Sequence, residues 1–281
     1  MVLEQQEWSP GQKVGPEIPE IFRDSRLRSV HWRDLVPVGR LEIVFELALP
    51  AFWLALSLAA ARVHWYLPAL ASSFLFFLTG LRLVHNAFHS ALGIGRGATD
   101  AVLGIMSVIM LGSMHAVKFN HLRHHRLTLG EGDVEGRSAE MPAWRALLFG
   151  PAFPVLLHAT ALGHKQKALR AQVIGELAAN VIWVSMVFDV WHVGVLRYHV
   201  IAMAVGQCFT AFFAVWTVHH HCYRTHYIAR TLRNRIKNAV TFQMFLHIEH
   251  HLFPAVHTCH LSALSQRIDE VAPELKSKIV F

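Results

Sequence analysis

The sequence predicts an all-α integral membrane protein with about four transmembrane helices in two hairpins, interfacial helices and a cytosolic histidine-rich cap. The chain of 281 residues is 53% hydrophobic and only 16% charged, whereas a soluble domain carries about 25% charged residues. Long uncharged runs account for the missing charge, and about 20 apolar residues suffice to cross a bilayer. Several of the 21 histidines recur at helical spacing between these runs, which predicts the cap.

The first hairpin is predicted at residues 43–61 and 67–84, both long and apolar. The break between them, residues 62–66, places a charge and aromatic rings where a membrane interface would lie. Residues 1–41 mix prolines with scattered charge and form a predicted cytosolic N-terminal segment with little core of its own. This segment has no apolar run after a basic start, so we expect no cleavable signal peptide.

The third apolar run, residues 98–117, lies between two histidine clusters that must share one side of the membrane to cooperate. A single crossing would separate the clusters, and the run is too short to cross twice. We therefore predict an amphipathic or re-entrant helix against the cytosolic face. Residues 144–162 carry Pro151, Pro154 and His158, which favours the same interfacial interpretation.

The second hairpin is predicted at residues 173–190 and 200–218, joined by a short outer loop at 191–199. In this topology Arg62 and Arg197 face outward, and the other 24 of the 26 Lys and Arg residues are cytosolic. That asymmetry is typical of four spans with both termini inside. The net charge of +7 then reflects the membrane surface, and no nucleic-acid partner is expected. Residues 42–270 form the predicted membrane domain, and residues 271–281 form a C-terminal tail.

Three histidine clusters, which we call boxes, have helical spacing. The first box is HxxxH, and the second and third are both HxxHH, so each places its imidazoles on one helix face. Their members are His85 and His89; His121, His124 and His125; and His247, His250 and His251. A run of three histidines, His219, His220 and His221, could add a ninth ligand.

Eight or nine imidazoles are too many for one zinc ion, which takes about three protein ligands in a catalytic site. They suit two metal ions with four or five ligands each, although imidazole alone does not select the metal. The H-E-x-x-H pattern of zinc proteases is absent. The cysteines, Cys208, Cys222 and Cys259, are far apart, which argues against a disulfide framework or a thiolate cluster.

The three boxes at the ends of a four-span topology resemble those of the membrane fatty acid desaturase family, the non-haem di-iron enzymes. Residues 245–254 are especially similar to bacterial members that have no fused cytochrome domain, and the resemblance covers residues 43–270. It implies iron ligation by the eight box histidines. A ninth ligand is expected between the last span and the third box; we favour His220, with His219 as its substitute.

The resemblance also implies carboxylates that hold the second nitrogen of a metal-bound imidazole. Asp133 ranks first, because the family often has an acidic residue at that distance after the second box. Asp100, Glu135 and Glu249 are further candidates, and for Glu135 an exposed loop position is the stronger expectation. Asn86 or Asn120 could orient a ligand or hold a water, although for each a local cap is the stronger expectation. No catalytic side chain is assigned apart from the metal centre.

The implied reaction is O2-dependent oxidation of an unactivated C–H bond by two non-haem iron ions, with O2 as co-substrate. Desaturation of a fatty acyl chain is preferred; the alternative is a hydroxylase or ketolase acting on an alkane, a carotenoid or a small metabolite. A rival from another class is a histidine-rich metal transporter, which predicts ligands deep in several spans. A haem-binding electron carrier would instead place histidines on paired helices within the membrane.

The expected location is the bacterial inner membrane, with termini and active site in the cytosol. Electrons are expected from a separate ferredoxin, rubredoxin or cytochrome. A basic cytosolic face could dock that donor or bind anionic lipid headgroups equally well; its residues are Arg224, Arg230, Arg233, Arg235 and Lys237. An aromatic set could line a substrate passage, with lipid contact or packing as the stronger expectation: Phe209, Phe212, Phe213 and Trp216.

Overall fold

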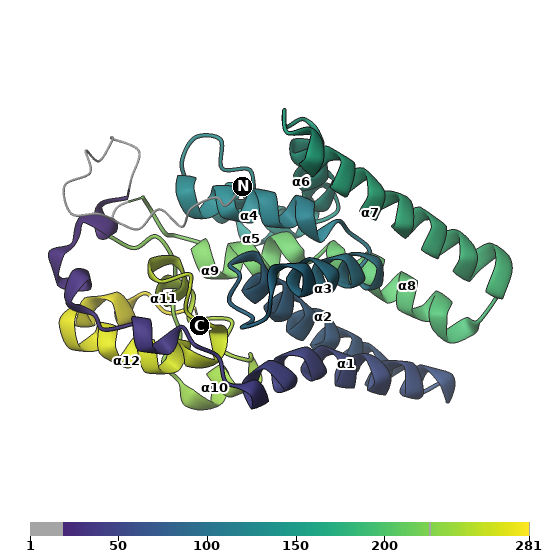
Figure 1. The fold of residues 1–281 in the computed structure, drawn as a ribbon, viewed down its shortest axis with the longest axis horizontal. Coiled ribbons are helices and arrows are strands. Elements are labelled where there is room, and N and C mark those ends of the chain that lie inside the picture. The colour runs from purple at the N-terminus through teal and green to yellow at the C-terminus, as the bar shows by residue number, and fades with distance from the viewer. Residues whose placement is uncertain (1–18, 225, 281) are drawn as a thin grey trace.

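The computed structural model describes residues 19–224 and 226–280, and these residues are predominantly helical. Within that part of the chain, the one β-type pairing is an isolated bridge between Thr231 and Ile279. Figure 1 shows two long helical hairpins extending toward one end of the molecule and a cap of shorter helices at the other. The predicted all-α membrane-protein class is therefore confirmed.

The first hairpin consists of α1 (Arg40–Arg62) and α2 (Tyr66–Phe88), which pack along one another. Both are long and apolar enough to cross a membrane. The chain reverses at residues 63–65, where His64 adopts a positive φ of 60°. Large apolar side chains point outward from both helices; Phe52 is 60% exposed and Leu70 is 52% exposed. Such surfaces are favourable against lipid rather than water.

The second hairpin begins with α7 (Lys167–Ser185), which continues into the π-helical turn η5 (Met186–Trp191). It returns through α8 (Gly194–Gln207), the π-helical turn η6 (Ala211–Trp216) and α9 (Thr217–His219). The returning arm bends by 42° at its break. Since α8 already begins at Gly194, the connecting loop is shorter than the predicted 191–199.

Between the hairpins, α3 (Arg96–Ile109) and α4 (Met114–Leu127) meet at 112°. The reversal is sharp because Leu111 adopts a positive φ of 57°, and the Ser113 hydroxyl then caps α4 by accepting from the Ala116 N–H. The apolar run 98–117 is therefore bent and does not form one straight span. This agrees with the sequence, which predicts an amphipathic or re-entrant helix here. A second bent pair, α5 (Ala143–Phe149) and α6 (Ala152–Leu162), meets at 59°.

Among the described residues, three single helices could cross a membrane, and up to six spans result if each bent pair counts as one. The four-span prediction corresponds to α1, α2, α7 with η5, and the bent arm from α8 to α9. The pairs α3–α4 and α5–α6 then take the interfacial or re-entrant positions.

The cap is built from short elements of the C-terminal region together with the N-terminal turns. Its C-terminal elements are α10 (Arg235–Val240), α11 (His247–Leu252), η7 (Thr258–His260), α12 (Leu261–Val271) and η8 (Pro273–Ser277). The 3₁₀ turns η1 (Glu20–Arg23), η2 (Ser25–Ser29) and η3 (Arg33–Leu35) lie against them. Ile21 and Leu27 share a buried cluster with Ile248 and Leu264, so residues 19–35 act as a strap across the cap.

Candidate metal centre

The three boxes lie on three different helices that converge near the cap. In the first box, His85 lies in the last turn of α2 and His89 is its C-cap; the second box lies in α4, and the third box forms most of α11. His219 ends α9, where the second hairpin returns. Chain topology thus brings together histidines that are far apart in sequence.

Nine histidines assemble into two groups whose potential ligand atoms lie within 4.8 Å of one another in each group. The first group contains His85, His89, His121, His125 and His250, and the second contains His124, His219, His247 and His251. Both HxxHH helices divide their histidines between the groups, because neighbouring positions on a helix point in different directions while positions four apart align. We call these the five-histidine group and the four-histidine group.

The Nε2 atoms meet at close range inside each group. His250 and His125 approach to 2.9 Å in the five-histidine group. In the four-histidine group, Nε2 of His219 lies 3.0 Å from that of His124 and 3.0 Å from that of His247. Neighbouring imidazole nitrogens on one transition-metal ion with bonds of about 2.1 Å lie about 3.0–3.4 Å apart. The spacing therefore fits shared metal coordination.

The opposite ring nitrogens of several histidines are held by oxygen acceptors. Nδ1–H of His121 donates to Glu135 at 2.8 Å, and Nδ1–H of His124 donates to Asp133 at 2.7 Å. Nδ1–H of His219 donates to a backbone carbonyl at 2.9 Å. In the neutral ring, a proton on Nδ1 leaves Nε2 with its lone pair free. These contacts therefore orient the Nε2 lone pairs toward the centre of each group.

Burial keeps the third-box rings neutral. It lowers the pKa of His250 and of His251 well below the ordinary histidine value, and neighbouring histidines lower both further. Neutral imidazole is the form that binds metal. Among the described residues, neither of the two buried ring nitrogens of His85 has a hydrogen-bond partner. Converging imidazole nitrogens and the unpartnered ring of His85 fit two transition-metal ions, one in each group.

His220 lies outside both groups, although the sequence favoured it as the ninth candidate. Its ring stacks on Trp216 with a centroid distance of 4.2 Å, and its Nδ1 contacts the Ala139 carbonyl at 3.1 Å. The buried His219 enters the four-histidine group instead. The structure thus brings in the substitute rather than the favoured residue.

Glu135 is the site residue that sequence reasoning undervalued. It is not an exposed loop carboxylate: its side chain is 12% exposed and bonds to His121. The sequence does contain a signal for this role: Glu135 lies two residues after Asp133, so the same loop can offer one carboxylate to each of two second-box histidines. Asp100 is 56% exposed, and the fully buried Glu249 binds Thr231 and Arg233 rather than a box imidazole.

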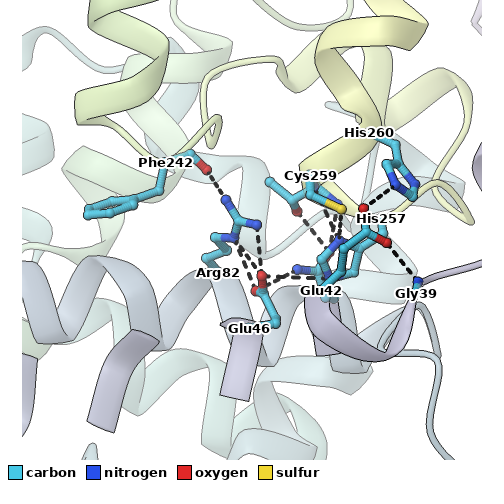
Figure 2. A network of polar contacts seen from close by, with 10 residues as sticks. Gly39, Glu42, Glu46, Arg82, Phe242, His257, Cys259 and His260 are labelled. Carbon is cyan, nitrogen blue, oxygen red and sulfur yellow. Dashed lines mark hydrogen bonds and ion pairs between the residues drawn. The ribbon is translucent and has the colours of Figure 1, made fainter. Parts of the chain in front are cut away.

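A buried polar network ties the first box to the cap (Figure 2). Arg82 binds the Glu46 carboxylate through two nitrogens, at 3.0 and 2.7 Å, and donates to the Phe242 carbonyl at 2.7 Å. The Asn86 side chain donates to Glu46 at 2.9 Å and accepts from the Thr258 N–H and hydroxyl at 3.1 and 2.8 Å. Asn86, which lies between the first-box histidines, therefore orients helices rather than a ligand.

The remaining predicted residues have structural surroundings. The Asn120 amide donates to backbone carbonyls of its own helix and of α6. Phe209 and Phe213 are 42% and 40% exposed, as lipid-facing side chains would be. Phe212 stacks on Trp216, whose indole N–H donates to the Met141 carbonyl.

Comparison with known proteins places these histidines in a family context. A family model described as "Fatty acid desaturase" matches residues 61–280. The chain is also 25% identical over 207 residues to "Sphingolipid delta(4)-desaturase/C4-monooxygenase DES2" of Bos taurus, which covers 68% of this chain and 60% of that protein. The chain thus spans about 60% of the length of this curated relative.

Proposed function

The chain belongs to the fatty acid desaturase family, and from that premise we propose that it is an O2-dependent membrane di-iron enzyme that desaturates a fatty acyl chain. The observation that carries the proposal is the division of nine buried or half-buried histidines into groups of five and four. Each group supplies a nearly complete nitrogen shell for one ion and leaves room for an exogenous ligand. Family membership supports a membrane oxidoreductase, and the histidine geometry supports the metal count.

In this proposal the nine histidines of the two groups are the iron ligands, with His219 in the place first given to His220. Bound iron would supply O2 activation and hydrogen removal from an unactivated C–H bond. The protein's own residues do the remaining work. Asp133 and Glu135 hold the Nδ1 protons of His124 and His121, which fixes ring orientation. Burial of the groups excludes water from the reacting centre.

The first experiment tests the ligand set. His219→Ala and His250→Ala should each lose iron and lower turnover by about tenfold or more. His220→Ala and His64→Ala are matched controls, because neither histidine belongs to a group, and both should keep wild-type iron content. Iron analysis of the purified variants together with a turnover assay gives the result. Full activity in His219→Ala, or iron loss in His220→Ala, would overturn the assignment.

The reaction outcome needs its own measurement, because desaturation and oxygen insertion can share one centre. The relative's printed name itself joins a desaturase and a monooxygenase. Mass spectrometry of the product separates them: loss of two hydrogens supports desaturation, while gain of one oxygen supports the hydroxylase or ketolase alternative. Acyl lipids are the first substrates to test, with alkanes and carotenoids next.

The metal-transporter alternative is less well supported. It predicts ligating histidines deep within several spans, whereas the two groups gather at helix ends beside the cap. About two non-haem irons per chain would support the enzyme, and metal flux into sealed vesicles would support the transporter.

We further propose that the protein resides in the bacterial inner membrane with termini and active site cytosolic. The domain limits at 1–41, 42–270 and 271–281 remain predictions.

The electron donor would be a separate ferredoxin, rubredoxin or cytochrome. Of the basic residues considered for docking, Arg233 is already paired with Asp269 and Glu249. Cysteine labelling in intact cells tests the orientation. The cysteine introduced by His64→Cys should react from outside, and the one introduced by Arg235→Cys should not.

A further inference from the structure

A second cluster of metal-binding side chains lies at the junction of α1 with the cap, outside both histidine groups. Glu42 comes from the first turn of α1, and Cys259 and His260 come from η7. Their potential ligand atoms all lie within 4.8 Å of one another. Figure 2 shows the three side chains converging from the two elements. The reaction proposed above uses none of them.

The His260 ring is already oriented for coordination. Its Nδ1–H donates to the Leu35 carbonyl at 2.7 Å, which leaves the lone pair of Nε2 free in the neutral ring. That nitrogen lies 3.0 Å from Oε1 of Glu42. A lone pair facing a carboxylate oxygen is repulsive unless a proton or a cation lies between them. Metal-bound histidines commonly use such a carbonyl to fix their second nitrogen.

The other two donors complete a mixed set. Glu42 is held through its second oxygen, Oε2, which accepts from the Gly39 N–H at 2.7 Å, so Oε1 is available. Burial raises the pKa of the Cys259 thiol to about 12, so the sulfur is protonated without a cation. Coordination would convert it to the thiolate and release that proton to solvent. The site is open to loading, because Glu42 is 42% exposed and His260 is 20% exposed.

We propose that Glu42, Cys259 and His260 bind one zinc ion, with water in the fourth position. One oxygen, one sulfur and one nitrogen donor match the ligands of tetrahedral zinc, whereas magnesium and calcium prefer oxygen alone. The ion would join the start of α1 to η7, next to Thr258, which bonds to Asn86 of the first box. It would therefore clamp the cap onto the first hairpin, beside the histidine groups but separate from them.

Cobalt(II) provides a specific probe, because thiolate coordination gives a near-ultraviolet charge-transfer band that an all-histidine site cannot produce. Because the two histidine groups can also bind cobalt, cobalt is added beyond the two equivalents that they can hold. We then expect the purified full-length protein in detergent to develop this band, and zinc to abolish it. Cys259→Ser should lack the band. Cys222→Ser is the matched control and should keep it. Glu42→Gln and His260→Gln should each weaken cobalt binding by about tenfold or more.

Two outcomes overturn the zinc site. The first is the absence of a thiolate band in the wild-type protein, which is what a simple ion pair between Glu42 and protonated His260 predicts. The second is persistence of the band in Cys259→Ser. Neither outcome depends on iron or on turnover, so the fate of this site and that of the proposed enzyme activity are measured separately.

Discussion

Two carboxylates set the orientation of the second-box imidazoles. Asp133 accepts from His124 and also from the backbone N–H groups of Leu129 and Gly136, so its own position is fixed on both oxygens. Glu135 accepts from His121. A ring held in this way cannot swing its Nε2 away from the group, which lowers the entropic cost of binding a metal ion.

Replacement of Asp133 by asparagine keeps the shape but removes the charge that stabilises the Nδ1 proton of His124. We expect iron affinity or turnover to fall by about 10–100-fold. Asp100→Asn is the control, since Asp100 is 56% exposed and bonds to no histidine of either group. Iron titration followed by a turnover assay checks both variants. Wild-type iron affinity and turnover in Asp133→Asn would show that the carboxylate does not orient a ligand.

The choice between His219 and His220 shows where reasoning from the sequence stops. Helical spacing identified the boxes because α2, α4 and α11 are regular at those residues. The segment before His219 contains the π-helical turn η6, and a π turn shifts the angular position of everything after it. The pattern of apolar residues in 200–218 does not indicate that shift. Glu135 was ranked too low among the candidate carboxylates for a related reason: Thr128 and Leu129 have positive φ, and the loop after them brings Glu135 to His121.

At the scale of helices, close backbone contact decides where the bent pairs sit. Gly150 joins α5 to α6, and a Cβ placed there would lie 1.7 Å from the Cys208 carbonyl oxygen at the end of α8. Only glycine permits this approach. The contact positions α5 and α6 against the returning arm of the second hairpin.

Gly150→Ala should therefore force the two backbones apart and destabilise the protein by about 1–3 kcal/mol. Gly175→Ala is a matched control in the middle of α7, where a Cβ meets no atom within 4 Å. That second variant should stabilise α7 by about 0.5–1 kcal/mol, because alanine is the better helix former. Thermal unfolding in detergent measures both changes, and equal midpoints for the two variants would contradict the explanation.

The strap formed by residues 19–35 is held to the cap by ion pairs as well as by apolar packing. Arg267 lowers the pKa of Asp34 from 3.8 to about 2, and Arg26 lowers that of Glu274 from 4.5 to about 2. A depressed carboxylate pKa contributes stability above its unfolded value, and that contribution disappears as the pH falls through the folded value. The strap should therefore loosen between about pH 4.5 and pH 2.

Hydrogen exchange, corrected for the intrinsic pH dependence of the rate, tests this prediction. Amides of residues 19–35 should lose protection over that acid range before the amides of α2 do. Asp34→Asn should reduce their protection already at neutral pH. Protection that is constant from pH 5 to pH 2 would mean that apolar packing alone holds the strap.

For the molecule as a whole, the buried pair of Glu46 and Arg82 joins α1 to α2 and reaches the cap through the Phe242 carbonyl. Glu46 and Arg82 are 2% and 4% exposed, and Arg82 also reaches the carbonyl of Phe242. Charges inside an apolar helix are costly unless they are paired. The network therefore fixes how α1, α2 and the cap meet.

Removal of one partner should expose that cost. Arg82→Met leaves an unpaired buried carboxylate and should lower the free energy of unfolding by about 3–5 kcal/mol. The double variant Glu46→Leu/Arg82→Met removes both charges and should recover part of the loss. Thermal unfolding with and without iron measures each variant. A double variant no more stable than Arg82→Met would show that charge pairing is not the source of the effect.

Much of the overall arrangement follows from residue patterns, and the rest depends on tertiary contacts. Apolar run length predicted α1, α2 and α7, and the histidine spacing predicted the three helices that carry the boxes. The division of each box between two groups did not follow, because it depends on how α4 and α11 face one another. The pairing of Glu46 with Arg82 was equally hidden: they are 36 residues apart on different helices, and no periodicity links them.

The distribution of ligands along the chain also governs when the centre can form during biosynthesis. Both histidine groups include members from α11, near the C-terminal end of the sequence. A nascent chain that has inserted its two hairpins still lacks the residues that close either group. If the two groups hold iron as proposed, insertion of the metal would follow synthesis of α11 and docking of the cap, so the metal could not guide membrane insertion of the hairpins.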